Sequence, residues 1–262
     1  MPSTLTAARA ATRSLLLLLL ACSGDDGSTA GATGSPPPGP AAEGWISDYS
    51  EGAAAAECGA DEAAFAALPH VTVGAATIYV GFDQVSGNNQ DPVVARFDAG
   101  QPIWCRSHED DGPDGRAHGV TWDGGPYAYV VYTIVGGGSD LEGKGGWLSS
   151  YAPGSISGGG PKVSVVGRVD VSDGELDAAT FVIAVKSDNK VNSHGPRGAV
   201  TVLAGGGVEF LGASAHKAID ADGESAMDCT DYPFDTRYRF SPDLSQLLCA
   251  DATNCASQEP CD

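Results

Sequence analysis

The sequence predicts an all-β protein built from repeated sheet units, and three observations support this fold class. The 36 Gly and 16 Pro residues fill 52 of 262 positions, a density of helix-breaking residues that rules out long helices. From residue 70 onward, short runs of β-branched and aromatic residues alternate with clusters of Gly, Asn, Asp and Pro, as in strands joined by turns. These runs recur at nearly constant spacing, which is expected when each unit buries its faces against the next.

Composition and charge exclude two classes of protein. Acidic residues outnumber basic residues by 34 to 14, which gives a net charge of -20. A nucleic-acid partner is excluded because phosphate binding requires clustered Lys and Arg side chains. Disorder along the whole chain is excluded because hydrophobic residues reach 42% and charged residues only 18%.

The N-terminus has the features of an export signal. Arg9 and Arg13 form a basic region, and Leu15–Leu20 is an unbroken apolar run. The run is too short to cross a bilayer but suits the apolar region of a secretory signal. Residues 1–21 are therefore predicted to be a signal peptide.

The end of this segment carries a more specific pattern. Leu19, Leu20, Ala21 and Cys22 form a tetrad that resembles the lipobox of bacterial lipoproteins. The resemblance implies that Cys22 is acylated and becomes the first residue of the mature protein. It also implies sorting to the outer membrane, where the source cell has one, because Ser23 rather than Asp follows the Cys. The alternative is an ordinary signal peptide, cleaved near Ala21, that leaves an exported protein without a lipid.

Two further segments precede the β region. Residues 22–44 are predicted to be a flexible linker rich in Pro and Gly, stiffened in its middle by Pro36–Pro38. Residues 45–69 are predicted to be a short helical segment of one or two helices. Within it, Gly52–Leu68 is rich in Ala, and Pro69 ends the pattern.

Residues 70–262 are predicted to be a β-repeat domain. Its expected strands are Thr77–Phe82, Val93–Phe97, Ile103–Ser107, Gly119–Trp122, Ala128–Ile134, Gly146–Tyr151, Lys162–Val169, Phe181–Val185, Ala199–Leu203, Val208–Gly212, Arg237–Phe240 and Gln246–Cys249. Six side chains are expected to face a neighbouring sheet: Phe97, Trp104, Tyr129, Val131, Phe181 and Phe210.

A repeat is visible in the positions of similar dipeptides. Tyr79-Val80, Tyr129-Val130 and Phe181-Val182 each open an apolar strand, 50 and then 52 residues apart. An Asp-Gly turn follows in each unit, and about four units of this length fit into the domain. Each unit is expected to be one sheet.

Several of these runs resemble known repeats. Asp91–Gly100, followed by Ile103-Trp104, resembles the strand pair of the bacterial β-propeller repeat. Gly119–Asp123, followed by Tyr129-Val130 and Tyr132-Thr133, is similar to the next two strands of that family. Phe240–Asp243 with Leu247-Leu248 resembles a blade motif of periplasmic propellers. The resemblance implies a propeller-like array of about four blade units. An up-and-down barrel or a β-sandwich would show the same alternation and stays an alternative.

The cysteines support export. Six remain beyond the lipid attachment residue Cys22, and an even number in an exported chain predicts three disulfides with 15 possible connectivities. None of the six has the C-x-x-C spacing of a zinc or redox site. They are Cys58, Cys105, Cys229, Cys249, Cys255 and Cys261.

Two sets of residues are candidates for metal binding. His108 and His216 each lie seven residues before the Gly of an Asp-Gly turn. They could converge on a propeller axis and bind a metal, or each could hydrogen-bond the loop of the next unit.

Calcium is the second metal considered, and it is the one candidate cofactor. Asp220, Asp222 and Asp228 offer hard oxygen ligands, as do Asp110 and Asp111 with Asp114. Neither set has the spacing of an EF-hand, and turn chemistry alone also selects Asp and Gly at such positions.

No catalytic residue is assigned, because the chain has no G-x-S-x-G, phosphate-loop or dinucleotide motif. Trp104, Trp122 and Trp147 could stack on sugars or pack between sheets.

The expected function is that of an exported, lipid-anchored binding or scaffolding module at the cell envelope. Its expected partners are the membrane, through the lipid, and an envelope protein or a glycan. One alternative is a propeller-type hydrolase acting on a glycan or lactone. The other is a structural envelope protein without a soluble ligand.

Overall fold

The structure is a computed structural model that describes residues 55–87, 89–108, 114–135, 140–150, 155–156, 162–188, 190–232 and 234–262. By its internal contacts the chain divides into two units, residues 1–35 and 36–262, and every described residue belongs to the second. The predicted signal peptide, the lipid attachment residue Cys22 and the linker lie outside the described residues.

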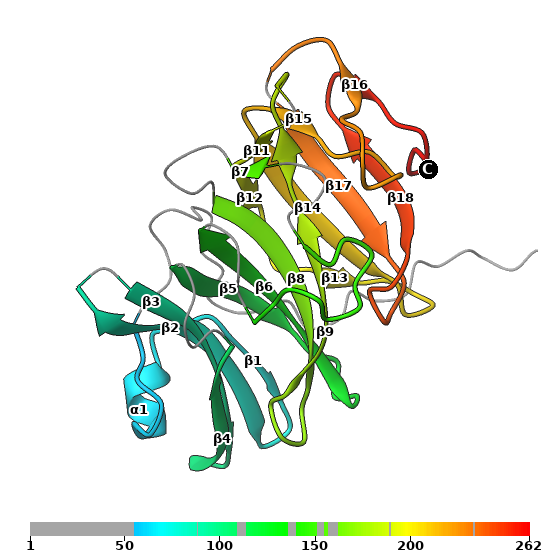
Figure 1. Cartoon of the computed structure of the whole chain (residues 1–262). Helices are drawn as coiled ribbons and strands as arrows, with labels where there is room; N and C mark the ends of the chain where they lie inside the picture. The colour runs from blue at the N-terminus through cyan, green and yellow to red at the C-terminus, as the bar shows by residue number, and fades with distance from the viewer. Residues whose placement is uncertain are drawn as a thin grey trace, which may run out of the picture. The chain divides into compact units, whose positions relative to one another are not determined.

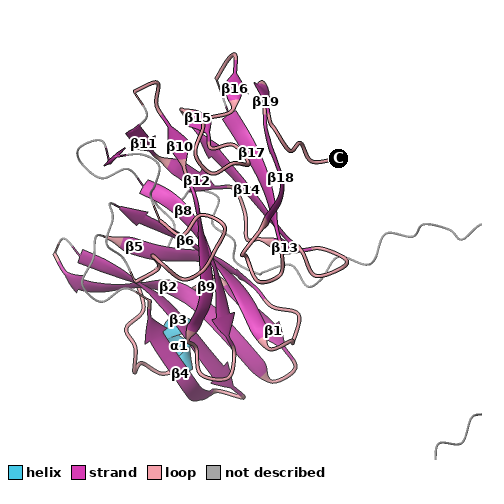
Figure 2. Cartoon of the chain, turned by 45° about the vertical axis from the view of Figure 1, so that its right-hand side comes forward, coloured by secondary structure: helices cyan, strands magenta, loops and turns pink. Residues whose placement is uncertain are grey.

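The prediction of an all-β protein is confirmed: strands dominate, and the described residues contain one short α-helix (Figure 2). The first sheet is a four-stranded antiparallel meander, in which every strand pairs with the next strand along the chain (Figure 1). Tight turns that contain Gly join these strands and fix their register. The strands are β1 His70–Val73, β2 Ala76–Ser86, β3 Asn89–Asp98 and β4 Gln101–Ser107.

The second sheet has the same meander order, β5-β6-β8-β9. Its central strands read almost continuously apolar because both of their faces are buried. The strands are β5 Gly115–Thr121, β6 Tyr127–Val135, β8 Lys162–Asp170 and β9 Leu176–Val182.

The third sheet has the order β12-β14-β17-β18, and β13 also pairs with β14. Its strands are β12 His194–Pro196, β13 Thr201–Val202, β14 Val208–Ser214, β17 Phe234–Phe240 and β18 Leu247–Ala252. Two small sheets complete the described fold, in the orders β15-β10-β11-β7 and β16-β19. Their strands are β7 Ser155–Ile156, β10 Ala184–Val185, β11 Lys190–Asn192, β15 Lys217–Ala218, β16 Asp228–Cys229 and β19 Cys255–Ala256.

The three large sheets pack against one another in chain order. Strand β5 contacts β1, β2 and β3 of the first sheet, and β12 contacts β6 and β8 of the second. One continuous core runs through all three sheets. Of the six side chains expected to face a neighbouring sheet, five lie in this core: Trp104, Tyr129, Val131, Phe181 and Phe210. Phe97 is also buried, but it belongs to a second, smaller cluster.

This second cluster covers the other face of the first sheet. Phe65 and Leu68 pack there on Tyr79 and Phe97, and α1, Glu62–Phe65, is the only helical turn between residues 55 and 69. The predicted helical segment is thus reduced to four helical residues, and residues 45–54 lie outside the described part. A helix this short is unstable alone, so packing on the sheet and not the Ala content decides its length.

The seam between the first two sheets is fastened at one carbonyl. The guanidinium of Arg96 on β3 and the indole of Trp104 on β4 both donate to the oxygen of Val171, at 2.8 and 2.9 Å. Val171 lies in the turn between the third and fourth strands of the second sheet.

The seam between the second and third sheets repeats this arrangement. Arg168 on β8 and the hydroxyl of Tyr129 donate to the oxygen of Pro242, at 3.2 and 2.7 Å. Pro242 lies in the corresponding turn of the third sheet. Arg96 and Arg168 are 72 residues apart, and Val171 and Pro242 are 71 apart, so the structural period is longer than the predicted 50 to 52.

The predicted repeat is therefore wrong in its third unit. Phe181-Val182 does not open a third sheet but ends β9, where Phe181 pairs with Val165 of β8. The connection between β6 and β8 contains β7, which pairs in a different sheet, and this insertion breaks the regular spacing.

Other predictions about strands and sheet closure also need correction. Residues 146–150 of the predicted strand Gly146–Tyr151 are irregular backbone with bends and not a strand, and Ala199–Leu203 is reduced to the two residues of β13. None of the sheets in the described residues closes on itself, so the up-and-down barrel alternative is wrong for this part of the chain. Blade-like arrangement of the sheets stays a prediction.

Candidate functional site: the edge of β4 and its two grooves

The outer strands of the second and third sheets are covered by other segments of the chain. On β9, Gly145 forms a parallel bridge with Ala179, and the amide of Phe181 donates to the oxygen of Leu148 at 2.8 Å. On β18, the amide of Ala250 donates to the oxygen of Glu259 at 2.8 Å. A segment from outside the two sheets therefore makes backbone contacts with each of these two strands.

Strand β4 is the outer strand of the first sheet, and β3 is its only strand partner among the described residues. Ile103 on this strand exposes 48% of its surface, which is high for a large apolar side chain in a sheet. The disulfide Cys58–Cys105 fixes β4 to the segment before α1, so this edge has a defined position.

An apolar groove lies on one side of β4, with a volume of about 380 Å³. One wall is the turn at Cys58 and the ring of Phe65, and the other is β4 itself. Its lining residues are Cys58, Gly59, Ala60, Phe65, Phe97, Pro102, Ile103, Trp104 and Cys105.

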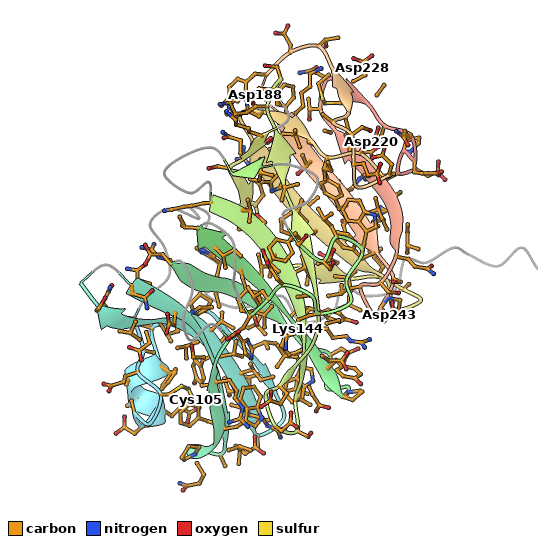
Figure 3. All side chains as sticks on the ribbon, in the orientation of Figure 1. Cys105, Lys144, Asp188, Asp220, Asp228 and Asp243 are labelled. Atoms are coloured by element: carbon orange, nitrogen blue, oxygen red, sulfur yellow. A yellow bond between two sulfur atoms is a disulfide. The ribbon has the colours of Figure 1, made fainter. Side chains whose placement is uncertain are left out.

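A polar groove of about 290 Å³ lies further along the same strand, at the seam with the second sheet. Arg106 forms an exposed ion pair with Glu175 at 3.1 Å. Lys144, labelled with Cys105 in Figure 3, also lines the groove, and it forms no ion pair with any described residue. The lining residues are Arg106, Ser107, His108, Asp140, Lys144, Glu175 and Leu176.

His108 forms the floor of this groove and is already fully hydrogen-bonded. Its Nε2 donates to the carbonyl of Gly174 at 2.9 Å, so its Nδ1 accepts from the hydroxyl of Tyr132 at 2.6 Å. Burial lowers the pKa of His108 and raises the pKa of Tyr132 well above its usual value, so both side chains stay neutral. Gly174 belongs to the second sheet, so His108 bonds the turn of the next unit, which is the second of the two roles considered for it.

The proposed metal pair does not form around His108. Both of its ring nitrogens have protein partners, and His216 is half-buried beside β15. Within the described ranges, no three His, Cys, Asp or Glu side chains gather closely enough to hold a metal ion.

The carboxylates proposed as calcium ligands accept hydrogen bonds within turns and loops. Asp220, which is buried, accepts from the amides of Ala221 and Gln258 at 2.7 and 3.0 Å. Partial burial disfavours ionisation of Asp222, but hydrogen bonds from Ser225, Glu224 and Gln258 outweigh it and lower the pKa of Asp222 to about 2.

The other acidic candidates are placed separately. Asp228 is an exposed residue of β16 (Figure 3). Asp114 accepts from the amide of Gln90 at 3.1 Å, and Asp110 and Asp111 lie outside the described residues.

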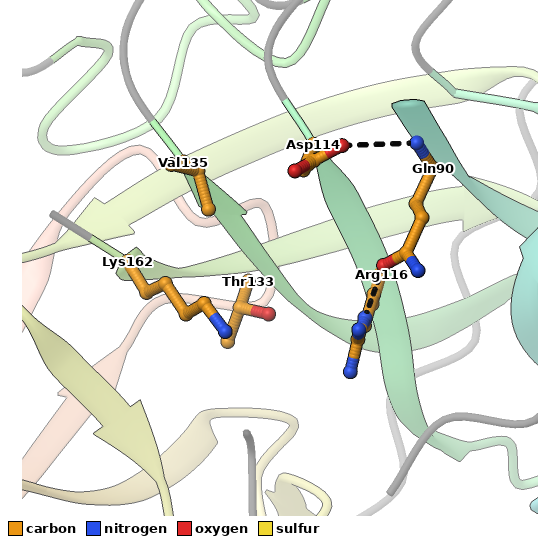
Figure 4. A pocket seen from close by; sticks show the side chains of 6 residues that line it. All are labelled: Gln90, Asp114, Arg116, Thr133, Val135 and Lys162. Atoms are coloured by element: carbon orange, nitrogen blue, oxygen red, sulfur yellow. Dashed lines mark hydrogen bonds between the residues drawn. The ribbon is translucent and has the colours of Figure 1, made fainter. Parts of the chain in front are cut away.

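Asp114 and Gln90 also line a small cavity of about 40 Å³ (Figure 4). Its other lining residues are Arg116, Thr133, Val135 and Lys162, from three strands of the second sheet. The cavity has room for about one water molecule and none for a larger ligand.

Two other buried histidines bond to hydroxyl groups. Nε2 of His118 lies 2.7 Å from the hydroxyl of Thr133, and Nε2 of His194 lies 2.8 Å from that of Thr236. Complete burial lowers the pKa of His194 to about 3. His118 lies in β5 and His194 in β12.

The tryptophans act in packing. Trp104 and Trp122 are buried in the main core, and Trp147 packs against Tyr238 and Phe240. The sugar-stacking alternative therefore has no exposed indole face at Trp104 or Trp122.

The prediction of three disulfides is confirmed. The bridges join Cys58 to Cys105, Cys229 to Cys255 and Cys249 to Cys261. Two of them fasten the C-terminal segment, which contributes little apolar area of its own.

Comparison with known proteins adds no relative. No protein-family model matches the chain, and no curated protein has a significantly similar sequence. No helix of the described residues is long and apolar enough to cross a membrane.

Proposed function

We propose that this chain is an exported, lipid-anchored module that binds or scaffolds another component of the cell envelope. The observation that carries the proposal is the β4 edge, which has a groove on either side and is held by a disulfide. Three disulfides are compatible with an oxidising compartment outside the cytosol. The proposed anchor is the acyl chain on Cys22.

We also propose that the three large sheets are arranged like the blades of a propeller. Two meander sheets of four strands, and a third sheet built around β14 and β17, pack in sequence. Both seams use an arginine on the third strand that donates to a carbonyl in the next sheet's turn. This repeated contact supports stacking of equivalent units, as in a propeller-like array.

Fractionation of a bacterial host that expresses the full chain tests the proposed anchor. We expect the protein to sediment with membranes after a high-salt wash, and Cys22→Ser to move it to the soluble exported fraction with its disulfides intact. Ser23→Ala is the matched control, because it changes the adjacent residue and keeps the acylated thiol. A Cys22→Ser protein that still resists the salt wash would overturn the lipid anchor.

A further inference from the structure

We propose that the apolar groove beside β4 binds a segment of this same chain, the apolar cluster formed by Trp45, Ile46 and Tyr49. This inference goes beyond the proposed function, because it concerns how the domain is joined to its tether and not which envelope component it binds. The docked cluster leaves residues 23–44 as the spacer between the proposed lipid anchor and the domain. Four features carry the inference: the groove, a β-bulge in β4, the composition of the segment and its reach.

The groove combines buried aromatic rings with an exposed rim. Phe65 and Phe97 both line it, both are buried, and their ring centroids lie 5.2 Å apart. Gly59 and Pro102 also line it and are exposed to solvent. Its volume of about 380 Å³ is at the lower end of the range of pockets that hold small ligands, about 300–1,000 Å³. The groove therefore suits one or two apolar side chains.

A β-bulge places a large apolar side chain on the rim of the groove. Arg96 of β3 pairs with Trp104, but the next residue, Phe97, pairs with Pro102, so Ile103 has no partner on β3. Bulges bend a strand and redirect side chains, often beside a functional site. Ile103 exposes 48% of its surface here, and an apolar occupant of the groove would cover it.

The chain between the predicted lipid attachment residue and the described fold has one apolar cluster. Within residues 23–54, the large apolar and aromatic side chains are Trp45, Ile46 and Tyr49, and the other positions are small, acidic, hydroxylated or proline. A stretch that serves only as a spacer needs no such side chains, because flexible linkers consist of Gly, Ser and Pro. An aromatic side chain buries about 150–250 Å² when it docks, so this cluster is suited to binding an apolar surface.

The segment is long enough to reach the groove. Ala55 is the first described residue, and Cys58, three residues further on, lines the groove. An extended chain spans at most about 3.5 Å per residue, so Ala55 lies within about 10 Å of this wall. The nine residues that lead from Ile46 to Ala55 span up to about 30 Å, which is enough to turn back and place Ile46 and Trp45 over Ile103.

An occupant from the same chain suits this groove better than a separate molecule. Stable interfaces between proteins bury about 1,200 Å² or more, whereas this groove is formed by a few side chains. A segment on a short linker has an effective concentration on the order of 1 mM, so a weak contact is enough to hold it. A second copy would bring another net charge of -20 close to the first, and this repulsion opposes its docking.

Limited proteolysis of the purified full chain tests the contact. Chymotrypsin cleaves after aromatic residues, so the rate of cleavage after Tyr49, followed by intact-mass spectrometry, measures how often the segment leaves the groove. We expect this cleavage to be about tenfold faster in Ile103→Asp than in the unaltered protein, and about equally fast in Ile46→Ser. The variant with both changes should be no faster than either single variant, because both changes remove the same contact.

Matched controls separate docking from other effects of these changes. Leu211→Asp alters an exposed apolar residue of β14, and Ala42→Ser alters a linker position outside the cluster, so both should leave the cleavage rate unchanged. A synthetic peptide of residues 41–54, with and without Ile46→Ser, gives the rate of cleavage that the sequence alone allows. Circular dichroism verifies that Ile103→Asp folds, and Ile46→Ser tests the same contact from outside the described domain.

Photochemical cross-linking locates the docked cluster. Trp45→p-benzoylphenylalanine places a photoreactive ketone at the proposed contact. Irradiation should join this residue to the lining of the apolar groove within the same chain, as mapped by mass spectrometry of the digested protein. Ile103→Asp should lower the yield of this cross-link about tenfold.

Several outcomes would overturn the inference. These are equal cleavage rates in the unaltered protein and Ile46→Ser, a rate in the unaltered protein equal to that of the free peptide, and cross-links that map outside the groove. Cross-links that join two chains would also overturn it, because the occupant would then be a second copy. None of these measurements depends on Cys22 or on an envelope partner, so failure here and failure of the proposed function are distinguishable.

Discussion

The indole of Trp104 lies so close to Gly174 that a Cβ atom at Gly174 would be 2.6 Å from the indole Cε3. The same ring donates to Val171, three residues earlier in the same turn. One aromatic side chain of the first sheet thus fills the turn of the second sheet and bonds to it. The floor of the polar groove depends on this turn, since His108 also bonds to Gly174.

Trp104→Ala should lower the free energy of unfolding by about 3–5 kcal/mol, because it leaves a cavity at the seam and removes a buried hydrogen bond. Trp104→Phe keeps most of the ring and should lose about 1–2 kcal/mol. Urea denaturation followed by circular dichroism measures both values. A near-neutral Trp104→Ala would show that this seam does not stabilise the fold.

Gly174→Ala should destabilise the protein by about 2–4 kcal/mol through two effects. Its φ of 79° is unfavourable for any residue with a Cβ, and the added methyl group would collide with the indole. Gly74→Ala is the matched control, because Gly74 has a φ of 63° and open space around its Cβ position. It should cost only the backbone strain, about 1 kcal/mol. Equal losses in the two variants would contradict the close contact with Trp104.

Acid should destabilise the fold through the buried His194. Its pKa is lowered from 6.5 to about 3, so between these values the unfolded chain binds a proton that the folded chain does not. The free energy of unfolding is therefore unaffected by this group above pH 6.5 and falls below it, by about 1.4 kcal/mol per pH unit, until about pH 3. His108 contributes in the same direction, because burial lowers its pKa too.

Comparison with His194→Gln isolates this effect. The variant should be less stable at pH 8, because Thr236 loses its bond to the ring, but its stability should change less between pH 6.5 and 5. Urea denaturation at each pH gives both slopes. Parallel slopes for the two proteins would refute the assignment to His194.

The disulfides should differ in how much they stabilise. Cys58–Cys105 closes a separation of 47 residues, and Cys249–Cys261 one of 12. Loop-closure entropy then gives about 4 kcal/mol for the first and about 3 kcal/mol for the second. Denaturation of the two paired Cys→Ser variants measures this order, and alkylation without reductant followed by mass spectrometry should label none of the six cysteines. A larger loss from the shorter loop would show that local packing outweighs chain entropy.

Fold class was predictable because its signals are local. Alternation of apolar residues and Gly-containing turns identify strands such as β3 and β6 without reference to the rest of the chain. The grouping of strands into sheets could not be predicted from the sequence. Tyr129 and Phe181 belong to similar apolar runs, but Tyr129 lies on β6 and Phe181 near the end of β9 of the same sheet. Which strand pairs with which depends on contacts between distant segments.

The candidate site shows the same division. The even number of cysteines predicted three bridges, but their pairing required the fold. The position of His108 before an Asp-Gly turn made it a candidate, and one of its two predicted roles was a hydrogen bond to the loop of the next unit. The sequence did not identify the acceptor, which is the carbonyl of Gly174. The grooves join Ile103, Lys144 and Glu175 from separate segments, and no short pattern in the sequence connects them.

The disulfide between Cys58 and Cys105 also determines how the domain would bear tension. A pull on the N-terminal end of the chain reaches the described fold at residue 55, where Ala55 bridges Phe82. Without a covalent link, the load could peel residues 55–69 off the first sheet one contact at a time. The disulfide stops this peeling at Cys58 and transfers the load to β4, which pairs with β3 along its length. The bridge that shapes the apolar groove thus also protects the small cluster around Phe65 from mechanical unravelling.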